Sequence, residues 1–442
     1  MMRSLYSGVS GLRTHQTKMD VIGNNIANVN TTAYKSQSIT FADLMYQTTQ
    51  SASGPNAETG AGGTNARQIG LGVKSGAIST SITSSGANQT TNNPFDCRIT
   101  GDEFFVVSDG RNNYFTRDGS FYVDAAGNLC MTSNGYNVMG WGVDAQTGNI
   151  KPDTVQPLRV MGTQFMTYPA EATSKANMSG IIDRNDTDFE AGASGKTISL
   201  GVYDSLGYYY TVKFNMTQDA NDPHLYNLQV AQLLDANGDD VTGVTATLGG
   251  GSVALQYSDA TGKLVSVGGD STTTKATLTF TGSNALSTVE IDFAATTNEN
   301  NNGTSTVGAD NGDYDGLGTG RRVGNMSGIS IQQDGKIYAS YDNGQSRLLG
   351  QIAVASFANA SGLEKAGDNL YNATQNSGEF DGIGIDISSN GDYITTGVLE
   401  MSNVDLSAEF TEMITTQRGF QANSRIITVS DTLLEELVNL KR

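Results

Sequence analysis

Residues 399–434 read LEMSNVDLSAEFTEMITTQRGFQANSRIITVSDTLL, and an apolar residue recurs in this stretch at every seventh position. The recurring residues are Leu399, Leu406, Met413, Phe420, Ile427 and Leu434. The other end of the chain repeats the pattern with Leu5, Leu12, Met19 and Ile26. A seven-residue apolar repeat keeps one face of a helix turned toward a partner helix. The two ends are therefore predicted to pair with each other and to join a multi-helix assembly.

The two repeats predict a helix over residues 3–30 and a long helix over Val398–Leu440. Gly8, Gly11 and Gly23 each weaken the first helix by about 1 kcal/mol relative to alanine, so it is expected to be marginal before assembly. A second column of the C-terminal repeat is mostly polar and comprises Asn403, Phe410, Gln417, Ser424, Asp431 and Val438. One apolar column buries little area, which favours a helix among many neighbours over an ordinary core helix of its own domain.

The predicted interface for helix pairing and polymer contacts follows from these repeats. It comprises Leu5, Val9, Leu12, Met19, Ile26, Leu399, Leu406, Phe410, Met413, Phe420, Ile427 and Leu434.

The rest of the chain has the pattern of short strands and turns. Aromatic and β-branched runs alternate with Asp-Gly and Asn-Gly turns over residues 95–145, and further strand patterns follow to residue 396. The predicted fold is α+β, mostly β, with the terminal helices paired as a coiled-coil-like domain (1–30 and 398–442). The remaining divisions are a connecting segment (31–95), a discontinuous β-rich domain (96–160 and 321–397) and, nested within it, an inserted outer β-domain (161–320).

Composition and charge exclude some classes of partner. The formal net charge of the 442 residues is −19, and residues 150–320 hold 20 acidic against 8 basic residues. Nucleic-acid binding needs clustered lysine and arginine to displace counterions, so it is not expected. The acidity is interpreted as a hydrated, repulsive outer surface that keeps the protein soluble.

No catalytic or metal-binding set can be assembled from the sequence, so neither an enzyme nor a cofactor is expected. His15 and His224 lie far apart and are interpreted as surface histidines. The loop at Asp235 departs from a calcium-binding loop at its sixth and twelfth positions, Asp240 and Ala246. Asp310, Asp313 and Asp315 are interpreted as turn residues, with weak cation binding as the alternative. Cys97 and Cys130 could form one disulfide or stay as two buried thiols.

No targeting or membrane segment is expected. Polar residues interrupt any apolar run in residues 2–30, which excludes a typical cleaved signal peptide. No run approaches the roughly 18 apolar residues of a membrane span. The Thr, Asn and Gly richness nevertheless suggests an extracellular protein, which would need another export route.

Several motifs resemble the rod and hook family of bacterial flagellar axial proteins. The N-terminal motif is NNIANVNTTAYK over residues 24–35, and the C-terminal motif extends from Ser402 to Ser424. FTRDGSF at 115–121, SGL at 361–363 and GDNLY at 367–371 also resemble this family. Ala33 stands where the family usually has glycine. The motif residues carried over are Asn24, Asn25, Ala27, Asn28, Thr31, Tyr34, Lys35, Gln417, Arg418, Gln421, Ala422 and Asn423.

Within this family, the chain length and the insertion are most similar to those of the hook subunits. The resemblance implies a structural subunit that self-assembles into a curved flexible tube, a universal joint that transmits motor torque from rod to filament. It implies contacts with rod, hook-cap and hook-filament junction proteins, and type III export without a cleaved signal peptide. The alternatives are a distal rod or other hook-like axial protein, a secreted β-rich adhesin and, with no catalytic set to support it, a secreted hydrolase.

Overall fold

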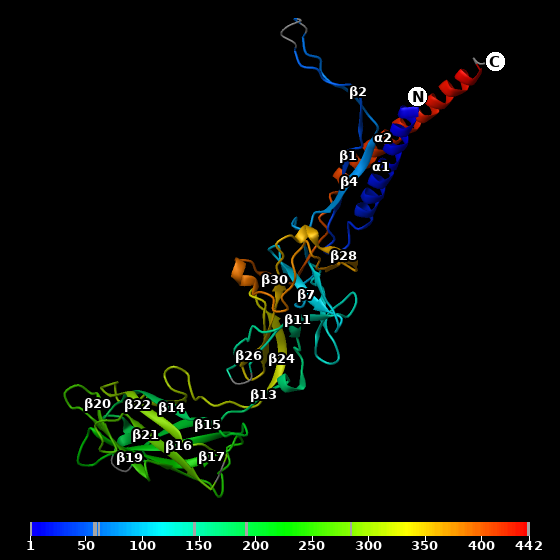
Figure 1. Ribbon diagram of the computed structural model, residues 1–442. Helices are drawn as coiled ribbons and strands as arrows, with labels where there is room; N and C mark the ends of the chain where they lie inside the picture. The colour runs from blue at the N-terminus through cyan, green and yellow to red at the C-terminus, as the bar shows by residue number, and fades with distance from the viewer. Residues whose placement is uncertain are drawn as a thin grey trace. The chain divides into compact units, whose positions relative to one another are not determined.

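The chain forms two compact units. The computed structural model describes residues 2–55, 60, 62–144, 147–190, 193–282 and 285–439. Unit 1 comprises residues 1–162, 329–339 and 347–442, and unit 2 comprises residues 163–328 and 340–346. Figure 1 shows mostly β-structure with a helix near each end, so the predicted fold class is confirmed. The finer division into a helical domain, a connecting segment and two β-domains stays a prediction.

Unit 2 is a β-sandwich with its own core. One sheet has the order β18-β21-β22-β14-β23 and the other has the order β15-β16-β17-β19-β20. Buried apolar residues alternate with less buried ones along the longer strands, as in Val212, Phe214 and Met216 of one sheet and Ile291 and Phe293 of the other. The strands are β14 (Lys175–Ile182), β15 (Lys196–Tyr203), β16 (Tyr209–Gln218), β17 (Leu225–Leu234), β18 (Thr245–Leu248), β19 (Ser252–Tyr257), β20 (Leu264–Val267), β21 (Lys275–Thr281), β22 (Val289–Asn298) and β23 (Gly308–Asn311).

Unit 1 contains a second β-core, built around strands in the order β26-β11-β7-β8-β29-β28. Phe104, Phe115, Trp141 and Tyr371 are buried in this core, and edge-to-face contacts join several of its rings. Its strands are β6 (Cys97–Ile99), β7 (Phe104–Ser108), β8 (Asn113–Thr116), β9 (Phe121–Val123), β10 (Leu129–Met131), β11 (Asn137–Gly142), β12 (Gln156–Pro157), β26 (Ser346–Ile352), β27 (Val354–Ala355), β28 (Glu364–Gly367), β29 (Leu370–Asn372) and β30 (Ile394–Thr396).

A few elements lie where the chain passes from one unit to the other. Each of the strands β24 (Gly324–Ile331) and β25 (Lys336–Tyr341) contributes residues to both units. The short strand β13 (Thr167–Tyr168) lies near the start of unit 2. Four short 3-10 helices complete the assignment: Thr163–Phe165, Thr187–Phe189, Ala360–Gly362 and Ile387–Asn390.

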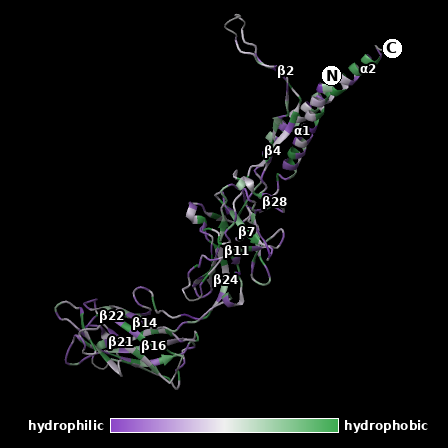
Figure 2. Ribbon diagram, in the orientation of Figure 1, coloured by the Kyte–Doolittle hydropathy of each residue, from purple (hydrophilic) through white to green (hydrophobic). Residues whose placement is uncertain are grey.

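The terminal part of unit 1 holds both long helices. α1 (Met2–Ala27) and α2 (Leu406–Asn439) lie side by side (Figure 1). Figure 2 shows hydrophilic and hydrophobic residues mixed along α1. The predicted last helical residue, Leu440, lies outside the described residues.

The predicted start of the C-terminal helix at Val398 is wrong. Residues Val398–Glu400 form strand β31, which pairs antiparallel with β5 (Asn88–Thr90). The helix begins only at Leu406, where the Asp405 side chain accepts a hydrogen bond from the Ser407 backbone N–H at 2.8 Å. Leu399 is buried in the strand, so it is not part of the helix. Its match to the seven-residue spacing is a coincidence, and its pairing with β5 overrides the local helical pattern.

Residues 31–95 contain more regular structure than the predicted connecting segment. β1 (Gln37–Asp43) pairs with β4 (Val73–Thr80), and β2 (Tyr46–Gln50) pairs with β3 (Arg67–Gly70). These two-stranded ribbons join strands about 20 to 35 residues apart, which local patterns do not reveal. Part of the predicted flexible loop, residues 56–59 and 61 of Ser51–Gly63, lies outside the described residues.

Candidate assembly interface

α1 and α2 form an antiparallel pair with very close backbones. A methyl group at Gly8 would lie 3.3 Å from Ile427, and one at Gly11 would lie 2.6 Å from Asn423 Nδ2. Further along, a methyl group at Gly419 of α2 would lie 2.6 Å from the His15 ring. Contact positions rise along α1 while they fall along α2, so the helices are antiparallel. Two of the three glycines that weaken α1, Gly8 and Gly11, let α2 approach it, whereas a methyl group at Gly23 would meet nothing within 4 Å.

Polar pairs hold the other end of the helix pair. Lys18 Nζ lies 3.0 Å from Glu412 Oε2, and Asn25 Nδ2 donates a hydrogen bond to Glu409 Oε1 at 2.8 Å. Burial raises the pKa of the Glu409 carboxyl, and the Asn25 hydrogen bond partly offsets that rise. We call the contact surface between α1 and α2 the seam. The polar contacts fix the antiparallel orientation of the two helices at the seam, because each charged or amide group needs its own partner.

The second column of residues predicted from the sequence to face the partner helix is not the one on α2 that faces α1. The side that faces α1 carries Glu409, Met413, Thr416, Phe420, Asn423, Ile427, Ser430 and Leu434, all of which are buried or half-buried. The column predicted from the sequence is turned away from α1, since Phe410 and Val438 are 50% and 70% exposed. The true second column is also polar and comprises Glu409, Thr416, Asn423 and Ser430. Asn423 of this column packs against Gly11, while the apolar Ile427 packs against Gly8.

On α1 the most buried positions are Gly8, Gly11, Thr14, Ile22 and Asn25. The apolar residues predicted at seven-residue spacing on α1 lie beside these most buried positions. They are half-buried and comprise Leu5, Leu12, Met19 and Ile26. Val9 is exposed. A period of seven was therefore correct for α1, but the face was displaced because glycine and threonine do not register as apolar.

His15 is not the surface histidine that the sequence suggested. Its ring lies against Gly419 and meets the Phe41 ring edge to face, with centroids 5.5 Å apart. Burial lowers its pKa, and the nearby Lys18 ammonium lowers it further. His224 also has partners, with Nε2 2.9 Å from Asp259 Oδ1 and Nδ1 3.1 Å from Asn298 Oδ1.

The asparagines of the N-terminal motif end α1 and fix the turn that follows it. Asn25 brackets Gln37, accepting from its backbone N–H at 3.0 Å and donating to its carbonyl at 2.8 Å. The Asn28 side chain donates to the Asn24 carbonyl at 2.9 Å, and Thr31 Oγ1 donates to Asn28 Oδ1 at 3.1 Å. Asn24 Nδ2 donates to the Tyr34 hydroxyl at 3.2 Å. Ala27, also part of the motif, is exposed.

Lys35 ends the motif in a buried charge network that the sequence did not reveal. Its ammonium lies 2.8 Å from Glu400 Oε1 and donates to the Ser84 carbonyl at 2.8 Å. Arg117 Nε lies 3.6 Å from the other Glu400 oxygen, and its guanidinium donates to the carbonyls of Gly101 and Glu103. The side chains of Lys35, Arg117 and Glu400 are each 1% exposed. Arg117 stands in a recognised motif, but nothing local marked Glu400 as its partner.

Some residues of the C-terminal motif contact α1, and others are exposed to solvent. Asn423 lies in the seam against Gly11. Gln417, Arg418, Gln421 and Ala422 are exposed, and Arg418 donates to Gln421 Oε1 at 3.2 Å. No contact within the described residues explains the motif at these four positions.

α2 also carries apolar side chains that its own chain leaves exposed. Leu406, Phe410 and Ile414 follow one another at four-residue spacing near its start, and Ile426, Val429, Leu433 and Leu437 form a second row near its end. Rows with this spacing lie on one side of a helix. Large apolar groups gathered in this way mark a surface that contacts another molecule.

The other chemical features considered in the sequence are structural. Cys97 and Cys130 are free and buried, and burial raises the pKa of both thiols. Asp235 and Asp313 accept backbone N–H groups of their own turns, and Lys175 Nζ lies 2.8 Å from Asp313 Oδ2. Within the described residues no group of three or more His, Cys, Asp or Glu side chains could hold a metal ion, and no described helix is long and apolar enough to cross a membrane.

Four family models match along the chain. They are the flagella basal body rod protein (5–35), the flagellar hook protein FlgE/F/G D1 domain (98–175), the flagellar basal body protein FlaE D2 domain (171–313) and the C-terminal region of the flagellar basal body rod FlgEFG protein (395–440). The chain is also 36% identical to flagellar hook protein FlgE of Borreliella burgdorferi, with both chains covered in full. This chain belongs to the flagellar hook protein family.

Two further matches accompany this membership of the hook protein family. The chain is 31% identical to flagellar basal-body rod protein FlgG of Bacillus subtilis, again with both chains covered in full. The crystal structure of Helicobacter pylori flagellar hook protein FlgE2 matches with a TM-score of 0.46 and 15% identity, over 71% of this chain and 100% of that one.

Proposed function

We propose that this chain is the structural subunit of the bacterial flagellar hook, assembling into a curved, flexible tube that carries torque from rod to filament. The chain is a structural protein and not an enzyme. The observation that carries the proposal is the helix pair, whose outer face keeps apolar rows exposed within its own chain. A surface that contacts a different surface on the next copy builds an open helical polymer.

Unit 2 has a different role in this proposal. Its sandwich has a closed core, and much of the acidic excess of the chain lies within residues 163–328. Hydrated acidic surfaces repel one another and do not form fixed contacts. Such surfaces can slide between neighbouring subunits when the tube bends, while the terminal helices keep the inner wall intact.

Negative-stain microscopy of the purified chain tests the proposal. The full chain should form curved tubes, and a chain without its first and last 30 residues should not, because α1 and much of α2 are then missing. A full-length chain that stays monomeric under every condition, including with hook-cap protein, would contradict it.

A distal rod or other hook-like axial protein is the second candidate, favoured by the full-length similarity to the rod protein of Bacillus subtilis. The two candidates differ in the shape of the polymer and in the mutant that the chain rescues. A hook subunit gives curved tubes and restores hooks to a hookless strain, whereas a rod subunit gives straight assemblies and does not.

The proposal also assigns partners and a location. The partners are further copies of the chain, the rod, hook-cap and hook-filament junction proteins, and the flagellar export apparatus. The location is the hook, outside the cell, after export without a cleaved signal peptide. Gly8, Gly11 and His15 of α1 pack against α2, so the proposal requires that the exported protein keeps them. Mass spectrometry of assembled protein should recover the peptides that contain these residues.

A further inference from the structure

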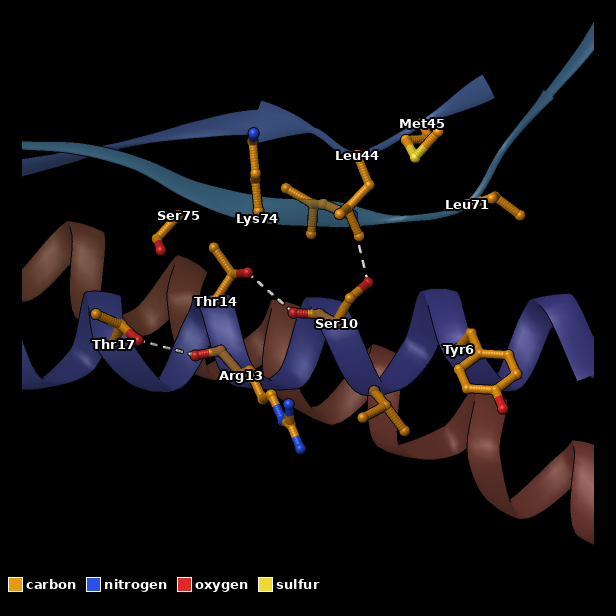
Figure 3. Close-up of a pocket in the computed structure, with 12 residues that line it drawn as sticks. Tyr6, Ser10, Arg13, Thr14, Thr17, Leu44, Met45, Leu71, Lys74 and Ser75 are labelled. Carbon is orange, nitrogen blue, oxygen red and sulfur yellow. Dashed lines mark hydrogen bonds between the residues drawn. The ribbon is translucent and has the colours of Figure 1, made fainter. Parts of the chain in front are cut away.

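A groove runs along the side of α1 that is turned away from α2. It has a volume of about 580 Å³ and lies between α1 and the segments at the base of the β2–β3 ribbon (Figure 3). Ser10 fixes its floor, since Ser10 Oγ accepts a hydrogen bond from the Val73 backbone N–H at 3.3 Å. This hydrogen bond joins α1 to the start of β4 along the floor of the groove.

The walls of the groove are largely apolar. Tyr6 and Val9 line it from α1, while Leu44 and Met45 line it from the link between β1 and β2, and all four are exposed. The nearby hydroxyl of Thr14 donates to the Ser10 carbonyl, so it does not make this wall polar. Both strands of the ribbon above the groove are exposed along their full length. A two-stranded ribbon without a packed face is marginal in water, so this region needs a covering partner.

The same chain carries an apolar row without a partner at the end of α2. Ile426, Val429, Leu433 and Leu437 lie within one side of the helix and are 42%, 57%, 48% and 50% exposed. Gly8 lies opposite Ile427 and α1 begins at Met2, so α1 runs beside α2 to about Leu433 and only the last described turn of α2 continues beyond it. The row lies beside the contact with α1 and stays exposed, so it is available to another copy.

Charge favours the match between row and groove. Arg13 and Lys74 line the groove, and within the described residues neither forms an ion pair. The last nine described residues of α2 carry Asp431, Glu435 and Glu436 and no basic side chain. Lys441 and Arg442 follow beyond the described residues. Opposite charges at the rim of an apolar contact guide encounter and orientation.

We propose that the Ile426–Leu437 row of one copy enters the groove of the next copy, between α1 and the segments at the base of the β2–β3 ribbon. The inference rests on the proposed function and specifies one contact within the polymer. Row and groove are different surfaces of the same chain, so each copy offers one of each and the contact repeats without closing. The entering helix also gives the base of the ribbon a face to pack on.

Cysteine cross-linking of mixed full-length chains tests the contact. A Leu44→Cys chain is mixed with a Leu437→Cys chain under mild oxidation, and dimers are counted on a denaturing gel. Cys97 and Cys130 are buried and do not interfere. Replacing Leu44→Cys by Tyr393→Cys, at a similarly exposed site of unit 1, gives the background. We expect at least about tenfold more dimer from the first mixture, which corresponds to a preference of about 1.4 kcal/mol.

A matched pair of α2 variants gives an independent readout. Leu437→Asp places a charge in the row and should reduce pelleted polymer by at least about tenfold. Val438→Asp places the same charge about 100° around the helix and should leave the polymer intact. If wild-type chains assemble but the Leu44 and Leu437 cysteines link no more than background, the groove contact is refuted and the hook function stands. If chains never assemble, the hook function fails, and dimer formation in concentrated solution still decides the groove contact.

Discussion

The buried network of Lys35, Arg117 and Glu400 joins three segments that are far apart in the sequence. The Glu400 carboxylate also accepts the Gly86 backbone N–H at 2.9 Å, and its backbone carbonyl accepts the Ala33 N–H at 2.8 Å. Ala33 has a φ of 56°, in the left-handed region that favours glycine. The hydrogen bond to Glu400 therefore helps hold the turn at the position where the family usually has glycine.

Glu400→Gln should destabilise unit 1 by about 3–5 kcal/mol. The change keeps the shape of the side chain but leaves the Lys35 and Arg117 cations buried without a counter-charge. Urea unfolding followed through the single, buried Trp141 measures the loss. Glu412→Gln is the matched control, since its pair with Lys18 is 56% exposed on the Glu412 side and should contribute less than about 1 kcal/mol. Equal effects of the two changes would contradict the network's role.

His15 should make the helix pair sensitive to acid. Its folded-state pKa is lowered by burial and by Lys18, so the unfolded chain binds more protons in the range between the folded pKa and the ordinary histidine value of about 6.5. Stability therefore rises with pH through this range and falls as the pH drops from about 6.5 toward the folded pKa. Thermal melts by circular dichroism at successive pH values measure the slope. His15→Gln should flatten it, and an unchanged slope would assign the effect to other groups.

At the scale of elements, the seam between α1 and α2 depends on small residues. Glycines let the backbones of the two helices come close together. The apolar residues at seven-residue spacing lie partly outside the contact between the helices. Glycine in a helix costs about 1 kcal/mol relative to alanine, and at the seam positions this cost is offset by closer packing.

Two glycine substitutions should separate these effects. Gly23→Ala should stabilise the protein by up to about 1 kcal/mol, because an added methyl group there meets nothing within 4 Å. Gly419→Ala should destabilise it, because the methyl group would lie 2.6 Å from the His15 ring. Denaturant unfolding of both variants provides the comparison. A gain at Gly419 equal to that at Gly23 would mean that His15 does not pack where the structure places it.

In the free subunit, α1 should exchange its amide hydrogens faster than β7 or β11. Its buried face consists largely of glycine, threonine and asparagine, which bury little apolar area, whereas β7 is buried along its whole length. Amide exchange of the monomer followed by mass spectrometry measures the difference. In assembled polymer the α1 amides should become protected, and equal protection in both states would show that the helices are ordered before assembly.

At the scale of the whole molecule, the two units have separate apolar cores. The core of unit 2 draws on residues 176–307, and that of unit 1 includes Phe104, Trp141 and Tyr371. The helix pair and the groove both belong to unit 1. This division predicts that unit 2 affects how a polymer bends more than whether it forms.

Deleting residues 165–315 should leave a chain that still forms tubes with altered bending or supercoil. The deletion removes the sandwich core but no residue of the α1–α2 seam. Negative-stain microscopy of the deleted and full chains gives tube formation and curvature. Loss of all tubes would make unit 2 an assembly element instead.

The sequence by itself determined the α+β class, the two terminal helices, their period of seven and the family motifs. These features are local, because helix periodicity and turn residues act within a few positions. The tertiary structure alone decided which face of each helix forms the seam. Glycine and threonine carry no apolar signal, yet they allow the closest approach. The tertiary structure also places Leu399 in a strand that pairs with β5, and it brings Lys35, Arg117 and Glu400 together. Pairing between distant segments has an energy that no single segment contains, so only the folded chain reveals it.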